Sequence, residues 1–177
     1  PDDFQIKEAA ELIKKSKKPI IIAGGGVFYS DATDELSSFA SKHNIPVTQT
    51  VMGYSSIKKD HSHYLGTIGG LGGKAANNLS KETDTAIAIG TKLADFTTGS
   101  WANFENPKFK LVSINAARFD ANKHMAQAVV GDAKVSLIEL SQALGNWKAD
   151  ESWYKKSRME LKSWDAYVDK ESGPTNQ

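Results

Sequence analysis

Short apolar runs recur along this chain and limit the folds that it can adopt. The clearest are Ile20–Ala23, Thr85–Gly90 and Lys110–Asn115, and Pro46–Thr50 and Gln127–Val130 have the same character. Short continuous runs, unlike alternating ones, are typical of strands buried on both faces, as in a parallel sheet covered by helices. Each of these runs therefore predicts a strand.

The segments between the runs predict helices. Asp2 is expected to cap the first helix, with the Gln5 side chain reaching back in a capping box. Ser30 or Asp31 is expected to cap the second, and Asp132 a third. Their inward faces carry residues at helical spacing, namely Ile6, Ala9, Ala10 and Ile13, then Leu36, Phe39, Ala40 and His43, then Ala133, Leu137, Leu140 and Leu144.

Residues 53–90 are the least regular part of the predicted fold. They hold seven of the fourteen glycines. Apart from a helix over Lys74–Lys81 and the strand that ends at Gly90, we interpret them as a long loop.

Strands that alternate with helices specify a doubly wound α/β fold, in which helices cover both faces of a Rossmann-like parallel sheet in three layers, α/β/α. Ligands of such sheets bind outside the carboxyl ends of the strands, near the point where the strand order reverses. We expect that edge to be formed by Gly24–Tyr29, Thr50–Tyr54, Gly90–Gly99 and Asn115–Asp120.

Charge and cysteine content exclude several classes of function. Lys plus Arg number 22 against 21 Asp plus Glu, a net charge of +1, which offers no broad attraction for nucleic acid or an anionic membrane. The absence of cysteine excludes disulfides, thiolate nucleophiles and Cys-ligated zinc. No apolar run approaches the length of a membrane span and no signal peptide is visible. We expect a cytoplasmic protein without nucleic-acid or membrane partners.

The run Gly24–Gly26 after the first strand looks like a phosphate-binding turn but departs from the known motifs. A dinucleotide fingerprint needs a third glycine where Tyr29 stands, and an acidic residue that the second strand lacks. A Walker loop would need G-K-S/T after the proper gap. NAD and ATP are therefore disfavoured, and what remains is a tight turn whose backbone amides could still face an anion.

No catalytic or metal-binding constellation emerges from the sequence. Residues 60–63 form a D-H-x-H cluster, but one short loop supplies too few convergent ligands, and we expect it to be a surface loop. His43 and His124 are expected to be structural or solvent-facing. Asp95 and Asp120 at the strand ends could each bind a ribose, accept a proton or cap a turn.

The chain beyond Trp147 predicts one more helix, which is amphipathic. Its apolar side chains recur at helical spacing among charged ones, namely Trp153, Leu161, Trp164 and Val168. The helix either docks on its own domain or carries its aromatic residues to a neighbouring domain or subunit, and both interpretations stay open. Because the chain starts at Pro1 and stops in the turn-forming residues 172–177, both ends are interpreted as cuts through linkers.

Six segments in order resemble the central domain of thiamine-diphosphate enzymes, the family of acetohydroxyacid synthase, pyruvate oxidase and benzoylformate decarboxylase. They read KKPIIIAGGGV, IPVTQTVMGYSSI, HYLGTIGG, DTAIAIGTKLADFTTGS, LVSINAARFDANKH and AVVGDAKVSLIEL, and they span nearly all of residues 1–145. The fourth and fifth look most like the branch that hydrolyses a C–C bond of a cyclic 1,2-dione, a trihydroxycyclohexanedione, in myo-inositol catabolism.

The resemblance implies a division of the chain and a place for its cofactors. Residues 1–147 would be a central domain of the DHS-like NAD/FAD-binding type, and residues 148–177 an amphipathic linker helix with the start of a linker to a C-terminal domain. Thiamine diphosphate and Mg²⁺ would be bound in the full-length parent by its N- and C-terminal domains, across subunits of a homodimer or homotetramer. The C-terminal domain supplies a G-D-G motif, whereas Ala133 follows Gly131 and Asp132 here.

In the flavin-binding members of the family, the central domain holds FAD along the strand ends. The resemblance carries those contacts to three groups of residues, namely Gly24, Gly25 and Gly26, then Gly90, Thr91, Lys92 and Asp95, and finally Asn115 and Asp120. The segment Phe96–Gly99 lacks the basic residue and valine of the flavin group, and the loop at residues 66–73 has more glycine than its counterpart. The hydrolase branch implies no flavin.

We therefore expect a vestigial nucleotide site in a structural and assembly domain, without catalytic residues or a metal site of its own, cut from an enzyme. The alternatives are an acetolactate-synthase-like central domain that binds FAD or ADP, a stand-alone nucleotide-binding module, and an interaction module that uses the last helix.

Overall fold

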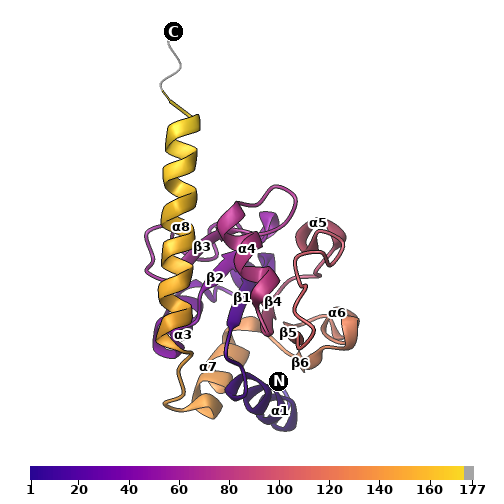
Figure 1. Cartoon of the computed structure of the whole chain (residues 1–177). Coiled ribbons are helices and arrows are strands. Elements are labelled where there is room, and N and C mark those ends of the chain that lie inside the picture. The colour runs from indigo at the N-terminus through magenta and orange to yellow at the C-terminus, as the bar shows by residue number, and fades with distance from the viewer. Residues whose placement is uncertain (174–177) are drawn as a thin grey trace.

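A single parallel sheet forms the centre of the molecule (Figure 1). The computed structural model describes residues 1–173, and the end of the predicted linker, residues 174–177, lies outside the described residues. Within residues 1–173 the sheet has six strands, with bounds β1 Pro19–Ala23, β2 Val47–Gln49, β3 Tyr64–Thr67, β4 Thr85–Ile89, β5 Lys110–Asn115 and β6 Gln127–Val130. Their order is β3-β2-β1-β4-β5-β6 and every neighbouring pair is parallel. The predicted doubly wound sheet is confirmed.

Strand β3 is the strand that the sequence did not predict. Its residues Tyr64–Thr67 include Gly66, at φ +101°, and make no continuous apolar run. The strand lies at an edge of the sheet and pairs only with β2, with a register shift after Val47. The Thr48 hydroxyl adds a hydrogen bond of 2.8 Å to the Gly66 carbonyl. Pairing on one side, rather than local propensity, makes this segment a strand.

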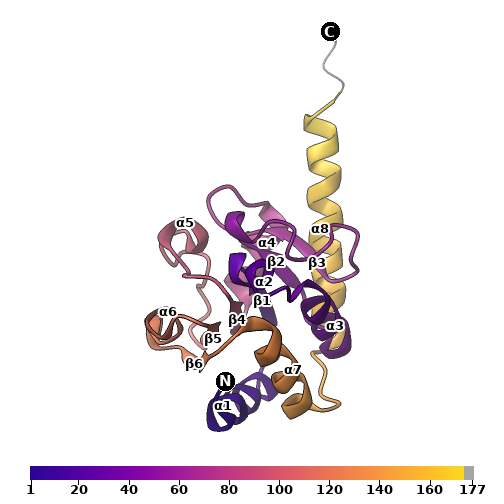
Figure 2. The same ribbon diagram turned by 180° about the vertical axis from the view of Figure 1, so that it is seen from behind.

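Helices cover both faces of the sheet, giving the predicted three layers (Figures 1 and 2). One face packs against α1 Asp3–Lys14, α3 Thr33–His43 and α7 Ala133–Leu144, and the other against α4 Lys74–Glu82 and α8 Glu151–Glu171. Short elements fill the connections, namely α2 Gly25–Tyr29, η1 Val51–Gly53, α5 Asp95–Thr98, α6 Arg118–Ala121 and η2 Lys123–Met125. Among the described residues, no helix is long and apolar enough to cross a lipid bilayer.

The central strands divide their side chains between two cores. In β1, Ile21 and Ala23 belong to the core under α1, α3 and α7, whereas Ile20 and Ile22 belong to the core under α4 and α8. Every residue of β1 and β4 is buried, as expected where both faces are covered. The unbroken apolar runs that predicted these strands follow from this burial.

The predicted capping box on α1 is half correct. The Asp2 carboxylate caps the helix by accepting the amides of Phe4 at 2.9 Å and Gln5 at 3.2 Å. The Gln5 side chain does not take its predicted role. Its oxygen accepts the amide of Val130 at 2.9 Å, and so ties α1 to the end of β6.

The prediction that Ser30 or Asp31 caps α3 is wrong. Ser30 ends the short helix α2, Asp31 has a left-handed φ of +50°, and α3 starts after Ala32. The cap predicted for α7 is correct, because the Asp132 carboxylate accepts the Val135 amide at 3.1 Å. The extra turn at α2, which the sequence did not predict, shifts the start of α3.

Helix α8 docks on the domain with its first half and extends away from it with its second half (Figures 1 and 2). Trp153 and Leu161 are buried in the core beside α4, and Trp164 packs partly against the same core. Docking on the chain's own domain is therefore correct for the first half of α8. Its second role as a connector, and the predicted boundary at residue 147, stay predictions.

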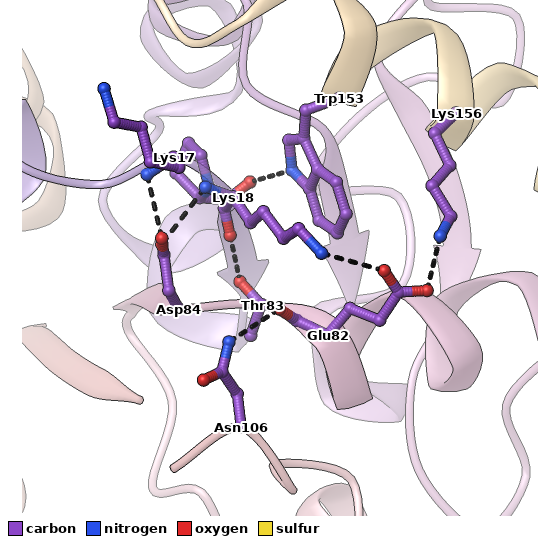
Figure 3. Close-up of polar contacts among 9 residues, drawn as sticks. Lys17, Lys18, Glu82, Thr83, Asp84, Asn106, Trp153 and Lys156 are labelled. Carbon is purple, nitrogen blue, oxygen red and sulfur yellow. Dashed lines mark hydrogen bonds and ion pairs between the residues drawn. The ribbon is translucent and has the colours of Figure 1, made fainter. Parts of the chain in front are cut away.

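Polar contacts fix the start of α8 to the amino edge of the sheet (Figure 3). The Trp153 indole Nε1–H donates to the Pro19 carbonyl at 2.8 Å. The Glu82 carboxylate lies between the ammonium groups of Lys18 at 3.0 Å and Lys156 at 2.5 Å. These lysines hold the pKa of Glu82 below its usual value. The contacts join α8, α4 and β1 on the side of the sheet opposite the carboxyl edge.

The turn between α4 and β4 belongs to the same network. The Asp84 carboxylate accepts the amides of Lys17 at 2.8 Å and Lys18 at 3.1 Å, and the Thr83 hydroxyl donates to the Lys18 carbonyl. Asn106 donates to the Glu82 carbonyl at 2.9 Å. These contacts hold together the residues that directly precede β1 and β4 (Figure 3).

Candidate functional site

The carboxyl edge of the sheet is the candidate site, because the strand order reverses there between β1 and β4. Since all strands are parallel, the segments predicted to form the site all leave the sheet at this edge. What each predicted residue can do depends on the partners that it finds there.

Three glycines bring the ends of β1 and β4 into backbone contact. The amide of Gly24 donates to the Ile89 carbonyl at 2.8 Å, and that of Gly26 to the Gly90 carbonyl at 2.9 Å. A Cβ atom on Gly24 would lie 2.4 Å from the Gly90 oxygen, and one on Gly26 would lie 2.5 Å from the Gly90 Cα. The glycines are required because two backbones approach each other, whether or not a ligand binds.

The connection after β2 closes over the end of β1 in the same way. The Thr50 amide donates to the Ala23 carbonyl at 2.9 Å. A Cβ atom on Gly53 would lie 2.2 Å from that carbonyl oxygen, and one on Gly25 would lie 3.0 Å from the Met52 oxygen. The turn after β1 is therefore enclosed by backbone from both neighbouring strand ends.

This packing changes what the glycine turn can bind. The amides of Gly24 and Gly26, predicted to face an anion, already have carbonyl acceptors within the chain. The helix that follows, α2, has only five residues, so its dipole is small. Two of the three donors expected for a phosphate are thus used in holding the sheet edge together.

The residues predicted after β4 divide into bonded and exposed groups. The Thr91 carbonyl accepts the Asn115 side-chain amide at 3.2 Å, and its hydroxyl accepts the Leu93 amide at 3.3 Å. Lys92 and Asp95 are exposed. Among the nine residues of the predicted site, these two carry charged side chains that reach solvent freely.

The residues predicted after β5 have partners within the chain. The Asn115 oxygen accepts the Ala117 amide at 2.9 Å, an Asx-type turn, while its amide group holds the loop after β4. The Asp120 carboxylate forms an ion pair with the Lys123 ammonium, which donates a hydrogen bond to it at 2.6 Å. Asn115 and Asp120 therefore shape their own loops.

A feature that the sequence analysis missed is the number of large apolar side chains exposed at this edge. Apart from Met125, which lies next to the start of β6, seven such residues in the connections that follow β1 to β5 are each more than half exposed. We name them the apolar rim, and they are Phe28, Tyr29, Met52, Tyr54, Leu71, Phe96 and Phe119. The signal that could have identified them is a large apolar residue that lies in a loop and is not part of the apolar pattern of any helix or strand.

The expectation of a surface loop for the D-H-x-H cluster is wrong for His63. Its side chain is buried, its Nε2 lies 3.1 Å from the Asn44 amide oxygen, and its ring centroid lies 4.6 Å from that of Tyr154. Within residues 1–173, no three His, Asp or Glu side chains converge as a metal site requires. The cluster supports the docking of α8.

His63 predicts a loss of stability in acid. Burial, followed by the nearby charges of His61 and Arg158, lowers the pKa of His63 from 6.5 to about 4. The unfolded chain therefore takes up a proton first as the pH falls, so the stability present above pH 6.5 is lost progressively down to pH 4. The pKa of His43 is lowered in the same direction by burial.

Urea denaturation at several pH values between 7.5 and 4.5 checks this prediction. With His63→Gln, the free energy of unfolding should fall less steeply as the pH decreases. The difference in slope should correspond to the uptake of at most one proton on unfolding. His124→Gln, at an exposed histidine, is the control and should follow the parent chain. Parallel profiles for all three proteins would contradict the assignment to His63.

The residues that come nearest to a thiamine-diphosphate motif have structural roles. Asp132, besides capping α7, has its pKa lowered first by a hydrogen bond from Ser30. A Cβ atom on Gly131 would lie 3.0 Å from the Pro1 nitrogen. The pair does not fit a magnesium diphosphate site, because its carboxylate is occupied and its glycine is packed against the N-terminus.

Comparison with known proteins gives a consistent result. A family model described as the central domain of thiamine pyrophosphate enzymes matches residues 6–140. The 3D-(3,5/4)-trihydroxycyclohexane-1,2-dione hydrolase of Clostridium perfringens (strain 13 / Type A) is 44% identical over 140 residues, which cover 79% of this chain and 22% of the relative.

Two further relatives agree. A hydrolase of the same name, numbered 1, from a strain of Bacillus cereus is 44% identical over 144 residues, and that of Bacillus anthracis is 43% identical over 144 residues. In both cases the match covers 81% of this chain and 22% of the relative. The chain thus spans about a fifth of the length of the curated relatives that it matches, and the resemblance seen in the sequence is confirmed.

Proposed function

The chain belongs to the family of thiamine pyrophosphate enzyme central domains, and from that premise we propose that it is the structural and assembly domain of a larger hydrolase. The parent would act on trihydroxycyclohexane-1,2-dione, the substrate in the names of its relatives. Thiamine diphosphate and Mg²⁺ would be bound by other domains of a cytoplasmic oligomer. On its own, the chain would be inert.

One observation carries this proposal. At the carboxyl edge, where a doubly wound sheet binds its ligand, the amides of Gly24 and Gly26 and the side chains of Asn115 and Asp120 have partners inside the chain. A site with most of its donors and acceptors already paired would have few groups left to hold a dinucleotide. The same contacts join the connections after β1, β4 and β5 at one edge, as an architectural domain requires.

The thermal stability of the 177-residue chain tests the proposal directly. A ligand at a hundred times its dissociation constant would stabilise the fold by about 2.7 kcal/mol. We expect FAD, ADP, and thiamine diphosphate with Mg²⁺, each at about 1 mM (roughly a hundredfold excess for a site with a dissociation constant near 10 μM), to leave the melting temperature unchanged. A rise with FAD or ADP would favour the acetolactate-synthase-like alternative.

The two exposed charged residues of the predicted site provide a test in the whole enzyme. Lys92→Ala and Asp95→Ala should leave the rate of dione hydrolysis and the affinity for thiamine diphosphate unchanged. A drop in either, together with FAD binding, would mean that the site is in use. If the whole protein lacks a thiamine-dependent activity on the dione, the proposed parent is wrong.

A further inference from the structure

We propose that the apolar rim is the surface through which this domain packs against another domain of the same enzyme. The inference deepens the proposed function and rests on it.

The exposed apolar residues gather on one edge of the molecule. Within residues 1–173, fourteen large apolar side chains are well exposed, and nine of them lie in the connections after β1 to β5. These nine are the seven of the rim, Val51, and Met125, which lies next to the start of β6 rather than at the carboxyl edge. Exposure reaches 83% at Tyr29 and 77% at both Met52 and Phe119. Single exposed apolar residues are ordinary on a protein surface, whereas a group of them on one face marks an interaction site.

The fold does not need these side chains for its own core. Beneath the rim, Val27 and Ile57 are buried and complete the core under α3. The rim residues sit one layer further out, and four of them lie on the turns after β1 and β2, whose backbone is fixed by the contacts of Gly24 and Gly53. These four are Phe28, Tyr29, Met52 and Tyr54. A rigid backbone that presents aromatic and methionine side chains to solvent has the composition and the preorganisation of an interface core.

The polar groups of the edge favour a protein partner over a small ligand. The amides of Gly24 and Gly26 and the side chains of Asn115 and Asp120 are bonded within the chain, so few groups of the predicted site remain to orient a ligand. The exposed charged side chains of the same connections are of both signs, with Lys92 and Arg118 against Asp60 and Asp95 among them, and the chain carries a net charge of only +1. That balance does not attract a lipid surface.

The area and the relatives identify the occupant. The five aromatic residues of the rim alone offer on the order of 600 Å², within the range of one side of an interface between domains. The relatives carry roughly four fifths of their length outside the part matched by this chain, since the match covers 22% of them. A further domain of the same enzyme is therefore available to cover the rim, and a second copy of this chain is the competing occupant.

The absence of cysteine in the chain allows a sharp test by thiol labelling. Tyr29→Cys, Met52→Cys and Phe119→Cys each place one thiol on the rim, and Met159→Cys, 71% exposed on α8, is the matched control. Maleimide labelling rates are compared between the 177-residue chain and the whole enzyme cleared of its other cysteines. We expect the rim thiols to react at least about tenfold more slowly in the whole enzyme, and the control within about twofold, as burial protects a thiol.

Three other outcomes of these measurements would overturn the inference. Equal rim rates in both proteins would overturn the inference while leaving the proposed function intact. Rim thiols already protected in the 177-residue chain, with a sedimentation coefficient that rises with concentration, would overturn it in favour of self-association. If the reading frame encodes no further domain, the proposed function and the inference fail together.

A charge placed on the rim provides a second measurement that is independent of labelling. The double variant Tyr29→Asp/Phe119→Asp should leave the melting temperature of the 177-residue chain nearly unchanged, because exposed positions tolerate substitution. In the whole enzyme it should lower the melting temperature, because the contact between the two domains is disrupted, whereas Met159→Asp should not. The same small effect in both settings would contradict the proposal.

Discussion

Gly90→Ala is expected to destabilise the chain by about 3–4 kcal/mol, the sum of a left-handed backbone cost and a steric clash. Gly90 has a φ of +60°, which a residue with a Cβ atom adopts only with strain. Its Cβ would also lie 2.5 Å from the Cα of Gly26, a backbone atom that cannot move aside as a side chain can. The switch point between β1 and β4 would have to open.

Two other glycines separate these effects. Gly99 has a φ of +59°, but a Cβ there would meet only Asn103 side-chain atoms at 3.6 Å, so Gly99→Ala reports the backbone cost alone. Gly24 has a negative φ of −105°, and a Cβ there would lie 2.4 Å from the Gly90 oxygen, so Gly24→Ala reports the clash alone.

Urea denaturation of the three variants is the measurement. We expect the loss at Gly90 to approach the sum of the losses at Gly99 and Gly24. A loss at Gly90 no larger than that at Gly99 would show that the two strand ends are not in rigid contact.

Much of the sheet could be predicted because burial on both faces leaves a local mark. The runs that became β1, β4 and β5 are apolar throughout most of their length, and each is covered by helices on both sides. The edge strand β3 carries no such mark, because three of its four residues are only partly buried and its identity comes from pairing with β2. For the same reason, the Gln5 side chain could not be assigned to the distant Val130 amide.

The candidate site, too, could be predicted only in part. Parallel strand ends could be located from the order of the runs, and so could Gly24, Gly26 and Gly90. Whether their amides are free could not be predicted, because the acceptor for Gly26 lies on Gly90, which is far away in sequence. The rim was missed because exposure depends on which way a turn directs a side chain, and composition does not record that direction.

Trp153→Ala is expected to cost about 3–5 kcal/mol, the range for removing a buried tryptophan. The side chain is 3% exposed and packs in the core under α4 and α8, where Ile20 and Ile22 of β1 also lie. Its Nε1–H donates to the Pro19 carbonyl at 2.8 Å, and the Lys18 ammonium lies 5.5 Å from the centre of its ring. The substitution removes apolar contacts and leaves a carbonyl unpaired.

Two variants separate the contacts from the hydrogen bond. Trp153→Phe keeps most of the apolar area and removes the donor, so it should cost about 1–3 kcal/mol for the unpaired carbonyl. Trp164→Ala, about three helical turns further along α8 and only partly buried, should cost less than Trp153→Ala. Free energies of unfolding from urea titration of the 177-residue chain provide the comparison.

The result bears on how α8 works as well as on how firmly it is bound. If Trp153→Ala is much the costlier of the two alanine variants, the first half of α8 belongs to the core of the domain, and only its second half is free to reach a neighbour. If the two cost the same small amount, the helix is held weakly by its own domain, and the connector interpretation gains. The effect of Trp164→Ala should then grow in the whole enzyme, because the neighbour that α8 reaches would be present there.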